Sequence, residues 1–219
     1  MRILVTAGPT REYLDDVRFL SNASSGRMGY SIAEAAIARG HHVVLVTGPV
    51  EIPVPVAAEV YRVETTDELR TKFLELFPQC DGVIAVAAVC DYRPRERIIG
   101  KITKTGRPIM LELVETSDVL AELGEQKAHR WVVGFALESQ DPRTNAMRKL
   151  RLKHCDCIAV NDTSAISSLE NRVEILSPHA KTLAVFQGTK TNIATQLIHF
   201  VESMIAVTPE NKSRTGPSA

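Results

Sequence analysis

The sequence has few aromatic residues, no excess of charge of either sign and no long apolar run. Phe, Trp and Tyr make up 5% of its 219 residues, so the core must be built mainly from aliphatic side chains and alanine. The 26 basic and 26 acidic residues cancel, which excludes a global attraction to nucleic acid or to an acidic membrane. The longest apolar run, at 83–90, is too short to span a bilayer. An anionic ligand must therefore be held by a local site.

The sequence also lacks a secretory signal and the cysteine spacings of metal sites. It opens directly into a strand pattern, without the basic, apolar and small-residue regions of a signal peptide. Its four cysteines follow neither zinc-finger nor CxxC spacing, which favours free thiols in a cytoplasmic protein. Cys155 and Cys157 are interpreted as alternate residues of one strand, with both side chains on the same face.

Short apolar runs alternate with longer segments of helical period. This pattern is typical of a parallel sheet covered by helices, so the predicted fold class is α/β, with a Rossmann-like, mainly parallel sheet. Strands are expected near residues 2–7, 42–47, 59–63, 82–87, 131–136 and 156–160. Helices are expected near residues 27–39, 66–76, 117–126, 142–153 and 190–206.

One segment departs from this alternation and predicts a β-hairpin that protrudes from the sheet. Its two apolar stretches, 98–104 and 109–113, flank a Thr-Gly-Arg-Pro turn in which Gly106 and Pro108 supply the reversal. We call residues 98–114 the flap.

The C-terminal part predicts an antiparallel edge of the sheet, with strands near 172–176 and 181–186. Residues 1–207 are expected to form one nucleotide-binding domain. The polar, proline-containing tail at 208–219 is expected to be disordered.

Polar clusters follow four of the predicted strands, where ligands of an open parallel sheet bind. Ser24, Ser25 and Gly26 stand just before a predicted helix, whose unpaired first N–H groups suit a phosphate; simple helix capping is the alternative. Lys149 and Lys153 share one helical face, which is either a solvated face or an anion site.

The two other clusters have an equally plain structural interpretation. Asp91 follows the fourth predicted strand and could simply begin a turn before Pro94. Asn161 to Ser164, after the sixth strand, could likewise be no more than a turn.

A strand that leads to glycine and a helix also raises the hypothesis of a dinucleotide-binding oxidoreductase. That hypothesis predicts a GxGxxG turn and an acid at the end of the second strand. The turn here is not GxGxxG, and the second strand ends Thr47-Gly48-Pro49 with no acid. NAD(P) chemistry is therefore the weaker interpretation.

Taken in order, five groups of residues resemble the phosphopantothenoylcysteine synthetase family, over roughly residues 1–205. The matching motifs are residues 6–12 (TAGPTRE), 17–22 (VRFLSN) with 24–29 (SSGRMG), 87–92 (AAVCDY), 101–104 (KITK) and 134–136 (GFA). The ordered set is more specific than any single motif.

The resemblance implies a cytoplasmic homodimeric ligase of coenzyme A biosynthesis. Such an enzyme activates the carboxylate of 4′-phosphopantothenate with CTP, releases pyrophosphate, and joins the acyl-cytidylate to L-cysteine with loss of CMP. Mg²⁺ is the implied cofactor, because it bridges and screens phosphates. A separate flavin-dependent decarboxylase is expected in the pathway, and neither a nucleic-acid nor a membrane partner is expected.

The resemblance also assigns roles to residues. It implies that Asn22 and Lys101 are catalytic, that Asn22 and Lys104 bind substrate, and that Asp91 lies beside the ribose or the metal-bound phosphates. The family's nucleotide-contacting positions match Ser24, Ser25, Gly26, Ala85, Val86, Ala87, Asp91, Lys101, Ser117, Asp118, Phe135, Lys149 and Lys153.

The sequence departs from the family pattern at three places. Thr103 replaces a lysine of the usual Lys-Ile-Lys-Lys, Cys90 replaces a common alanine, and residues 115–118 read ETSD where Asn-Pro-Asp is usual. An ATP-using member of the family and a catalytically silent binding module therefore stay open as alternatives. The six histidines receive no role.

Overall fold

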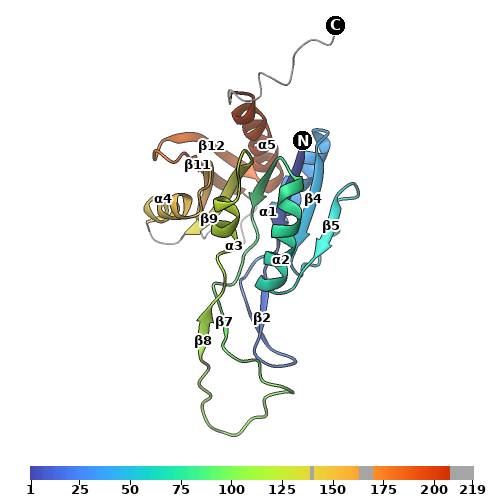
Figure 1. The fold of residues 1–219 in the computed structure, drawn as a ribbon, viewed down its shortest axis with the longest axis vertical. Helices are drawn as coiled ribbons and strands as arrows, with labels where there is room; N and C mark the ends of the chain where they lie inside the picture. The colour runs from blue at the N-terminus through green and yellow to red at the C-terminus, as the bar shows by residue number, and fades with distance from the viewer. Residues whose placement is uncertain (139–140, 163–169, 208–219) are drawn as a thin grey trace.

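The computed structural model describes residues 1–138, 141–162 and 170–207, and its centre is an eight-stranded sheet (Figure 1). The strand order β12-β11-β10-β9-β6-β1-β4-β5 confirms the α/β prediction. All pairs from β5 to β10 are parallel, whereas β11 and β12 form the predicted antiparallel edge. The strands are β1 (Arg2–Ala7), β4 (His42–Thr47), β5 (Glu59–Arg62), β6 (Gly82–Ala85), β9 (Trp131–Glu138), β10 (Cys157–Asp162), β11 (Glu170–Leu176) and β12 (Thr182–Thr189).

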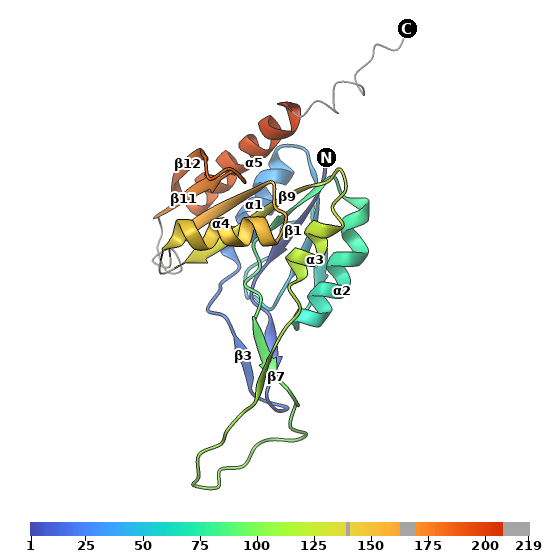
Figure 2. The same cartoon turned by 60° about the vertical axis from the view of Figure 1, so that its left-hand side comes forward.

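Helices cover both faces of this sheet, as Figure 2 shows from a second side. Apolar side chains of α1 and α5 pack on one face, and those of α2, α3 and α4 pack on the other. The α-helices are α1 (Arg27–Ala38), α2 (Thr66–Leu76), α3 (Val119–Glu125), α4 (Pro142–Leu152) and α5 (Lys190–Val207), with a short 3₁₀ helix η1 (Phe77–Gln79). All five predicted α-helices are confirmed to within two residues at each end.

The central strands read as continuous apolar runs because both of their faces are buried. Along β1, Ile3 and Val5 belong to the core on the side of α1 and α5, and Leu4 belongs to the core under α2. All three side chains are fully buried. The sheet is therefore the shared wall of two hydrophobic layers, and its strand ends are fixed in position.

Two short ribbons extend beyond the carboxyl ends of β1 and β6 (Figures 1 and 2). The first pairs β2 (Arg11–Tyr13) with β3 (Phe19–Ser21), and the second pairs β7 (Tyr92–Pro94) with β8 (Leu113–Glu115). The strands of neither ribbon are predicted from the sequence, because three residues carry too little alternation to be recognised.

The protruding hairpin is confirmed, but its strands are β7 and β8, so the prediction of strands at 98–104 and 109–113 is wrong. Cross-strand pairing at the base of the flap ends with the hydrogen bond from Arg95 N to Glu112 O (2.9 Å). No described residue between these two belongs to a strand. The first half of the flap bonds instead to the turn between β2 and β3. Ile98 N donates to Leu14 O (2.9 Å), and Gly100 O accepts from Asp16 N (3.3 Å). A long-range partner has replaced the local one.

The four cysteines are free and buried, but Cys155 and Cys157 do not share a face. β10 begins only at Cys157, which packs on the side of α1 and α5, while Cys155 precedes the strand and packs on the opposite side. The same-face interpretation is therefore wrong.

The tail at 208–219 lies outside the described residues. Among the helices that are described, none has the length and apolarity needed to cross a membrane.

Candidate functional site

A cavity of about 1000 Å³ lies beyond the carboxyl ends of the central strands. It is lined by Thr6 at the end of β1, Ala85 at the end of β6 and Phe135 on β9, with side walls from α1 and α4. The chain order reverses between β1 and β6, since β4 and β5 lie to one side and β9 and β10 to the other. Ligands of open α/β sheets bind at such a reversal.

The loop before α1 presents the start of this helix to the cavity. Gly26 is the N-cap residue with φ of 73°, and a Cβ there would lie 2.8 Å from Val50 Cγ1. Ser24 Oγ accepts a hydrogen bond from Gly26 N (3.3 Å), and no acidic residue stands in the first turn. Open N–H groups, together with Arg27 at the cavity wall, make this end suitable for an anion.

Asn22 lies at the mouth of the cavity, one residue after β3. Its Nδ2 donates to Ala88 O (3.2 Å) and Val89 O (2.8 Å), which fixes the amide plane. Its Oδ1 accepts no hydrogen bond from the residues that the structure describes. The side chain can therefore accept a hydrogen bond from a ligand without losing its own support.

The segment that follows β6 is held from below by buried threonine hydroxyls. Thr6 Oγ1 accepts from Val86 N (3.0 Å) and Ala87 N (3.1 Å), and Thr10 Oγ1 accepts from Cys90 N (2.9 Å). The amides of Val86 and Ala87 are thus already bonded, so a ligand would meet this segment through carbonyl oxygens and small side chains. Of the backbone contacts predicted at 85–87, those through the amides of Val86 and Ala87 are therefore not open to a ligand.

Helix α4 brings Lys149 and Lys153 to the cavity, as their shared face predicts. Each pairs with a carboxylate, since Lys149 Nζ lies 2.7 Å from Glu138 Oε1 and Lys153 Nζ lies 3.1 Å from Asp118 Oδ1. Arg148, on the same helix, makes no ion pair with any described residue. Among the described residues, Arg148 is therefore a cation of this wall without an acidic partner, whereas Lys149 and Lys153 each have one.

The remaining nucleotide-binding predictions also converge on the cavity. Phe135 is half-buried on β9, and Asp91 is exposed at the rim. Ser117 and Asp118 open α3, where the Asp118 carboxylate accepts from Ala121 N (3.1 Å) and caps the helix. All of these residues line the same space as Asn22 and the Ser24 to Gly26 loop.

The two flap lysines do not line the cavity. Lys101 and Lys104 are exposed on the flap, which extends away from the sheet beyond β7 and β8 (Figure 1). The structure thus brings twelve of the thirteen predicted nucleotide contacts together with Asn22, and leaves the two flap lysines outside the cavity.

Several residues of the cavity were missed by the sequence analysis as site residues. Lys190 begins α5, and burial together with the neighbouring Arg27 charge lowers the pKa of this lysine. Asn161, at the end of β10, has a buried Oδ1 without a hydrogen bond among the described residues. Arg27 stands directly after the glycine of the loop and could have been found from that position. Nothing local marks Lys190.

Comparison with known proteins identifies the family of this chain. Residues 1–205 match the model of the DNA/pantothenate metabolism flavoprotein C-terminal domain. The chain belongs to this family. It is 43% identical to the coenzyme A biosynthesis bifunctional protein of Bacillus subtilis over 164 residues, which cover 74% of this chain and 40% of that protein. It is 36% identical to a cysteine/cysteine sulfinic acid decarboxylase from an unknown prokaryote, over 93% of this chain and 58% of that protein.

Solved structures agree with the family assignment. The crystal structure of the C-terminal domain of a coenzyme A biosynthesis bifunctional protein superposes with a TM-score of 0.79 at 34% identity, covering 94% of this chain and 96% of that one. A Cab2 mutant in complex with phosphopantothenate-cysteine shares the fold, with a TM-score of 0.78 at 16% identity over 94% and 87% of the two chains. The chain spans only about two fifths of the Bacillus protein.

Proposed function

We propose that this chain is a phosphopantothenate–cysteine ligase of coenzyme A biosynthesis that uses CTP. The observation that carries the proposal is the convergence of Asn22, the start of α1 and the cationic face of α4 on one cavity. The coenzyme A biosynthesis relatives and the complex of Cab2 with phosphopantothenate-cysteine support the same substrate class.

In the first step, a carboxylate oxygen of 4′-phosphopantothenate attacks the α-phosphorus of CTP, and pyrophosphate leaves. Arg27, Arg148 and the open N–H groups of α1 offset the negative charge of the phosphates. Ser24 and Ser25 add hydroxyl donors at the same end of the cavity. Phe135 packs on the cytosine, and Lys149 and Lys153 exchange their carboxylate partners for phosphate.

In the second step, the amine of L-cysteine attacks the acyl carbon, and CMP leaves with the former carboxylate oxygen. The Oδ1 and Nδ2 atoms of Asn22 orient the acyl-cytidylate, because this amide is fixed by Ala88 and Val89. A neutral amide suits this role, since it offers an acceptor and a donor without adding charge.

Mg²⁺ fits this site only as an ion held mainly by the nucleotide. No group of three acidic, histidine or cysteine side chains among the described residues could hold a metal ion alone. Asp91 at the rim supplies one carboxylate, and Mg²⁺ is commonly bound by one or two carboxylates together with substrate phosphates. When bound there, the ion would screen the charge of the phosphates.

Lys101 is proposed to neutralise charge at the α-phosphate, and Lys104 to contact substrate. Both stand on the flap outside the cavity of their own chain, which favours an arrangement in which the flap reaches the partner of a homodimer. Large apolar side chains exposed on this part of the chain support self-association, because such patches are costly in water. They include Val17, Phe19, Tyr92, Ile99, Ile109, Met110 and Leu113.

The alternative nucleotide and cofactor are weaker candidates. An ATP-using enzyme would keep the same phosphate contacts and differ only at the base. An NAD(P) oxidoreductase would need an acid at the end of β4, which ends at Thr47. Completion of the pathway would require a separate flavin-dependent decarboxylase.

Pyrophosphate release tests the proposal directly. The protein is incubated with 4′-phosphopantothenate, L-cysteine and Mg²⁺, with CTP and ATP in parallel. Release is expected with CTP and should fall by a factor of about 100 to 1,000 in Lys101→Gln and Asn22→Asp, as for other electrostatic donors in active sites. Folded protein that releases no pyrophosphate with either nucleotide would refute the ligase, and equal release with both would refute CTP selectivity.

A further inference from the structure

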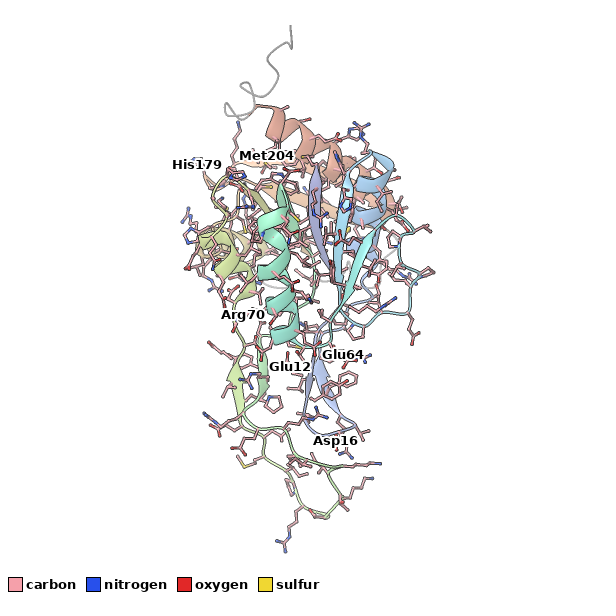
Figure 3. The ribbon with its side chains drawn as sticks, turned by 45° about the vertical axis from the view of Figure 1, so that its right-hand side comes forward. Glu12, Asp16, Glu64, Arg70, His179 and Met204 are labelled. Carbon is pink, nitrogen blue, oxygen red and sulfur yellow. The ribbon has the colours of Figure 1, made fainter. Side chains whose placement is uncertain are left out.

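The turn that joins β2 to β3 holds the part of the flap that carries Lys101. Figure 3 labels Asp16 at the far end of this ribbon, beside the flap. Main-chain bonds link the two segments, from Ile98 N to Leu14 O (2.9 Å) and from Asp16 N to Gly100 O (3.3 Å). Arg97 also lies over the ring of Tyr13, with 5.0 Å from Cζ to the ring centroid. The flap therefore lies against this turn up to residue 102.

The Asp16 carboxylate binds the residue before Lys101. Its Oδ2 accepts a hydrogen bond from Gly100 N (2.9 Å), and its Oδ1 pairs with Arg97 Nη2 (3.0 Å). Gly100 has φ of 79°, a left-handed conformation that favours glycine. One carboxylate thus fixes the main chain immediately before the lysine.

The Asp15 carboxylate binds the residue after Lys101. Its side chain is completely buried, and its Oδ2 accepts from Ile102 N (3.0 Å) while its Oδ1 accepts from Val17 N (2.8 Å). Arg18 Nη1 donates to the same Oδ2 and also to Ile102 O (3.2 Å). Burial raises the pKa of Asp15, but these amide and guanidinium donors outweigh it and hold the pKa well below its usual range.

Both peptide neighbours of Lys101 are therefore fixed, while its own side chain stays exposed. From Thr103 to Leu111, no described main-chain group makes a hydrogen bond outside its own stretch, so Lys104 lacks this support. Holding a reacting group in place removes an entropic cost from the reaction, and a displacement of about 1 Å can reduce a rate by about 100-fold. The support coincides with the one flap lysine to which a catalytic role is proposed.

We propose that Asp15 and Asp16 are positioning residues that hold Lys101 for its role at the α-phosphate, by fixing the main chain on both sides of it. This inference rests on the proposed function. Neither aspartate lines the cavity. Their ribbon leads directly into Asn22, so a single element supports both proposed catalytic residues.

A double-mutant cycle on the full chain tests this inference. Asp16→Ala is expected to lower kcat for pyrophosphate release by about 10- to 100-fold, because Lys101 loses its fixed position. Its KM for CTP should change by less than about twofold. In the Lys101→Gln background, Asp16→Ala should lower kcat by less than about twofold, because Asp16 acts only through Lys101.

Asp15→Asn provides a second variant that keeps the shape of the turn. The amide oxygen can still accept from Val17 N, while the amide nitrogen faces Ile102 N with a donor in place of an acceptor. Amide hydrogen exchange at Gly100 and Ile102 should become faster in both Asp16→Ala and Asp15→Asn. The matched control is Glu112→Gln, which removes the charge that pairs Glu112 of the flap with the exposed Arg95 at its base and should leave kcat and exchange at Gly100 unchanged.

The outcomes separate this inference from the function on which it rests. If wild type is active and Lys101→Gln is not, while Asp16→Ala and Asp15→Asn equal wild type, the positioning role is refuted and the ligase stands. An equal loss with and without Lys101 would also refute positioning, because the aspartates would then act through folding or assembly. If wild type releases no pyrophosphate, the proposed function itself fails.

Discussion

Thr6→Val should weaken both the fold and the floor of the cavity, because it removes one acceptor that serves two amides. Thr6 is 2% exposed, and its Oγ1 accepts from Val86 N at 3.0 Å and Ala87 N at 3.1 Å. Valine has nearly the same shape, so no space opens. A buried donor left without a partner costs about 1 to 3 kcal/mol. Both amides belong to half-buried residues, so a loss near the lower limit for each gives about 2 kcal/mol in total.

Urea unfolding measures this loss, with the fluorescence of the single tryptophan, Trp131, as the signal. Thr195→Val is the matched control, since the exposed Thr195 hydroxyl bonds, among the described residues, only to Thr191 O within its own helix. Thr6→Ser keeps the acceptor and should lose less than Thr6→Val. A change in the free energy of unfolding below about 0.5 kcal/mol for Thr6→Val, as expected for surface substitutions, would refute the reasoning.

Two further predictions concern stability. Gly29→Ala places a Cβ 2.6 Å from Ala7 Cβ, so α1 must move away from β1. Calorimetry should show that the free energy of unfolding falls by about 1 to 3 kcal/mol. The control Glu34→Ala, on the exposed face of α1, should lower it by less than about 0.5 kcal/mol. A hydrogen bond from Arg39 lowers the pKa of Glu202 below its ordinary value of 4.5, so this pair stabilises the protein above pH 4.5 and is lost as the pH falls further. Glu202→Gln should therefore cost about 0.5 to 1 kcal/mol at pH 7 and less at pH 3.5; a loss independent of pH would contradict the assignment.

Local periodicity was sufficient to predict the central sheet and its helices. Strands buried on both faces give apolar runs, and helices facing one layer give a regular stripe, so each element carries its own signal. The flap shows where this fails. Ile98 and Ile99 suggest a strand, but the partner of this segment is the turn after Leu14, more than eighty residues earlier in the chain. No local pattern reports such a distant pairing.

The candidate site was predictable where motifs follow strand ends. Asn22, Phe135 and the α4 lysines meet at one cavity because parallel strands end at the same edge of the sheet. What the sequence did not reveal depends on three-dimensional neighbours. Thr6 looks like an ordinary strand residue until its bonds to Val86 and Ala87 are known, and the placement of Lys101 outside the cavity follows from the ribbons.

Oxygen transfer within the reaction shows whether the carboxylate attacks the α-phosphorus of CTP. 4′-Phosphopantothenate labelled with ¹⁸O in its carboxylate is converted with CTP and L-cysteine, and the CMP is analysed by mass spectrometry. If the carboxylate attacks the α-phosphorus, one ¹⁸O atom must remain on CMP when the amine displaces it. The acyl-cytidylate mechanism predicts labelled CMP and unlabelled pyrophosphate. Amide formation with unlabelled CMP, or with the label in inorganic phosphate, would contradict it.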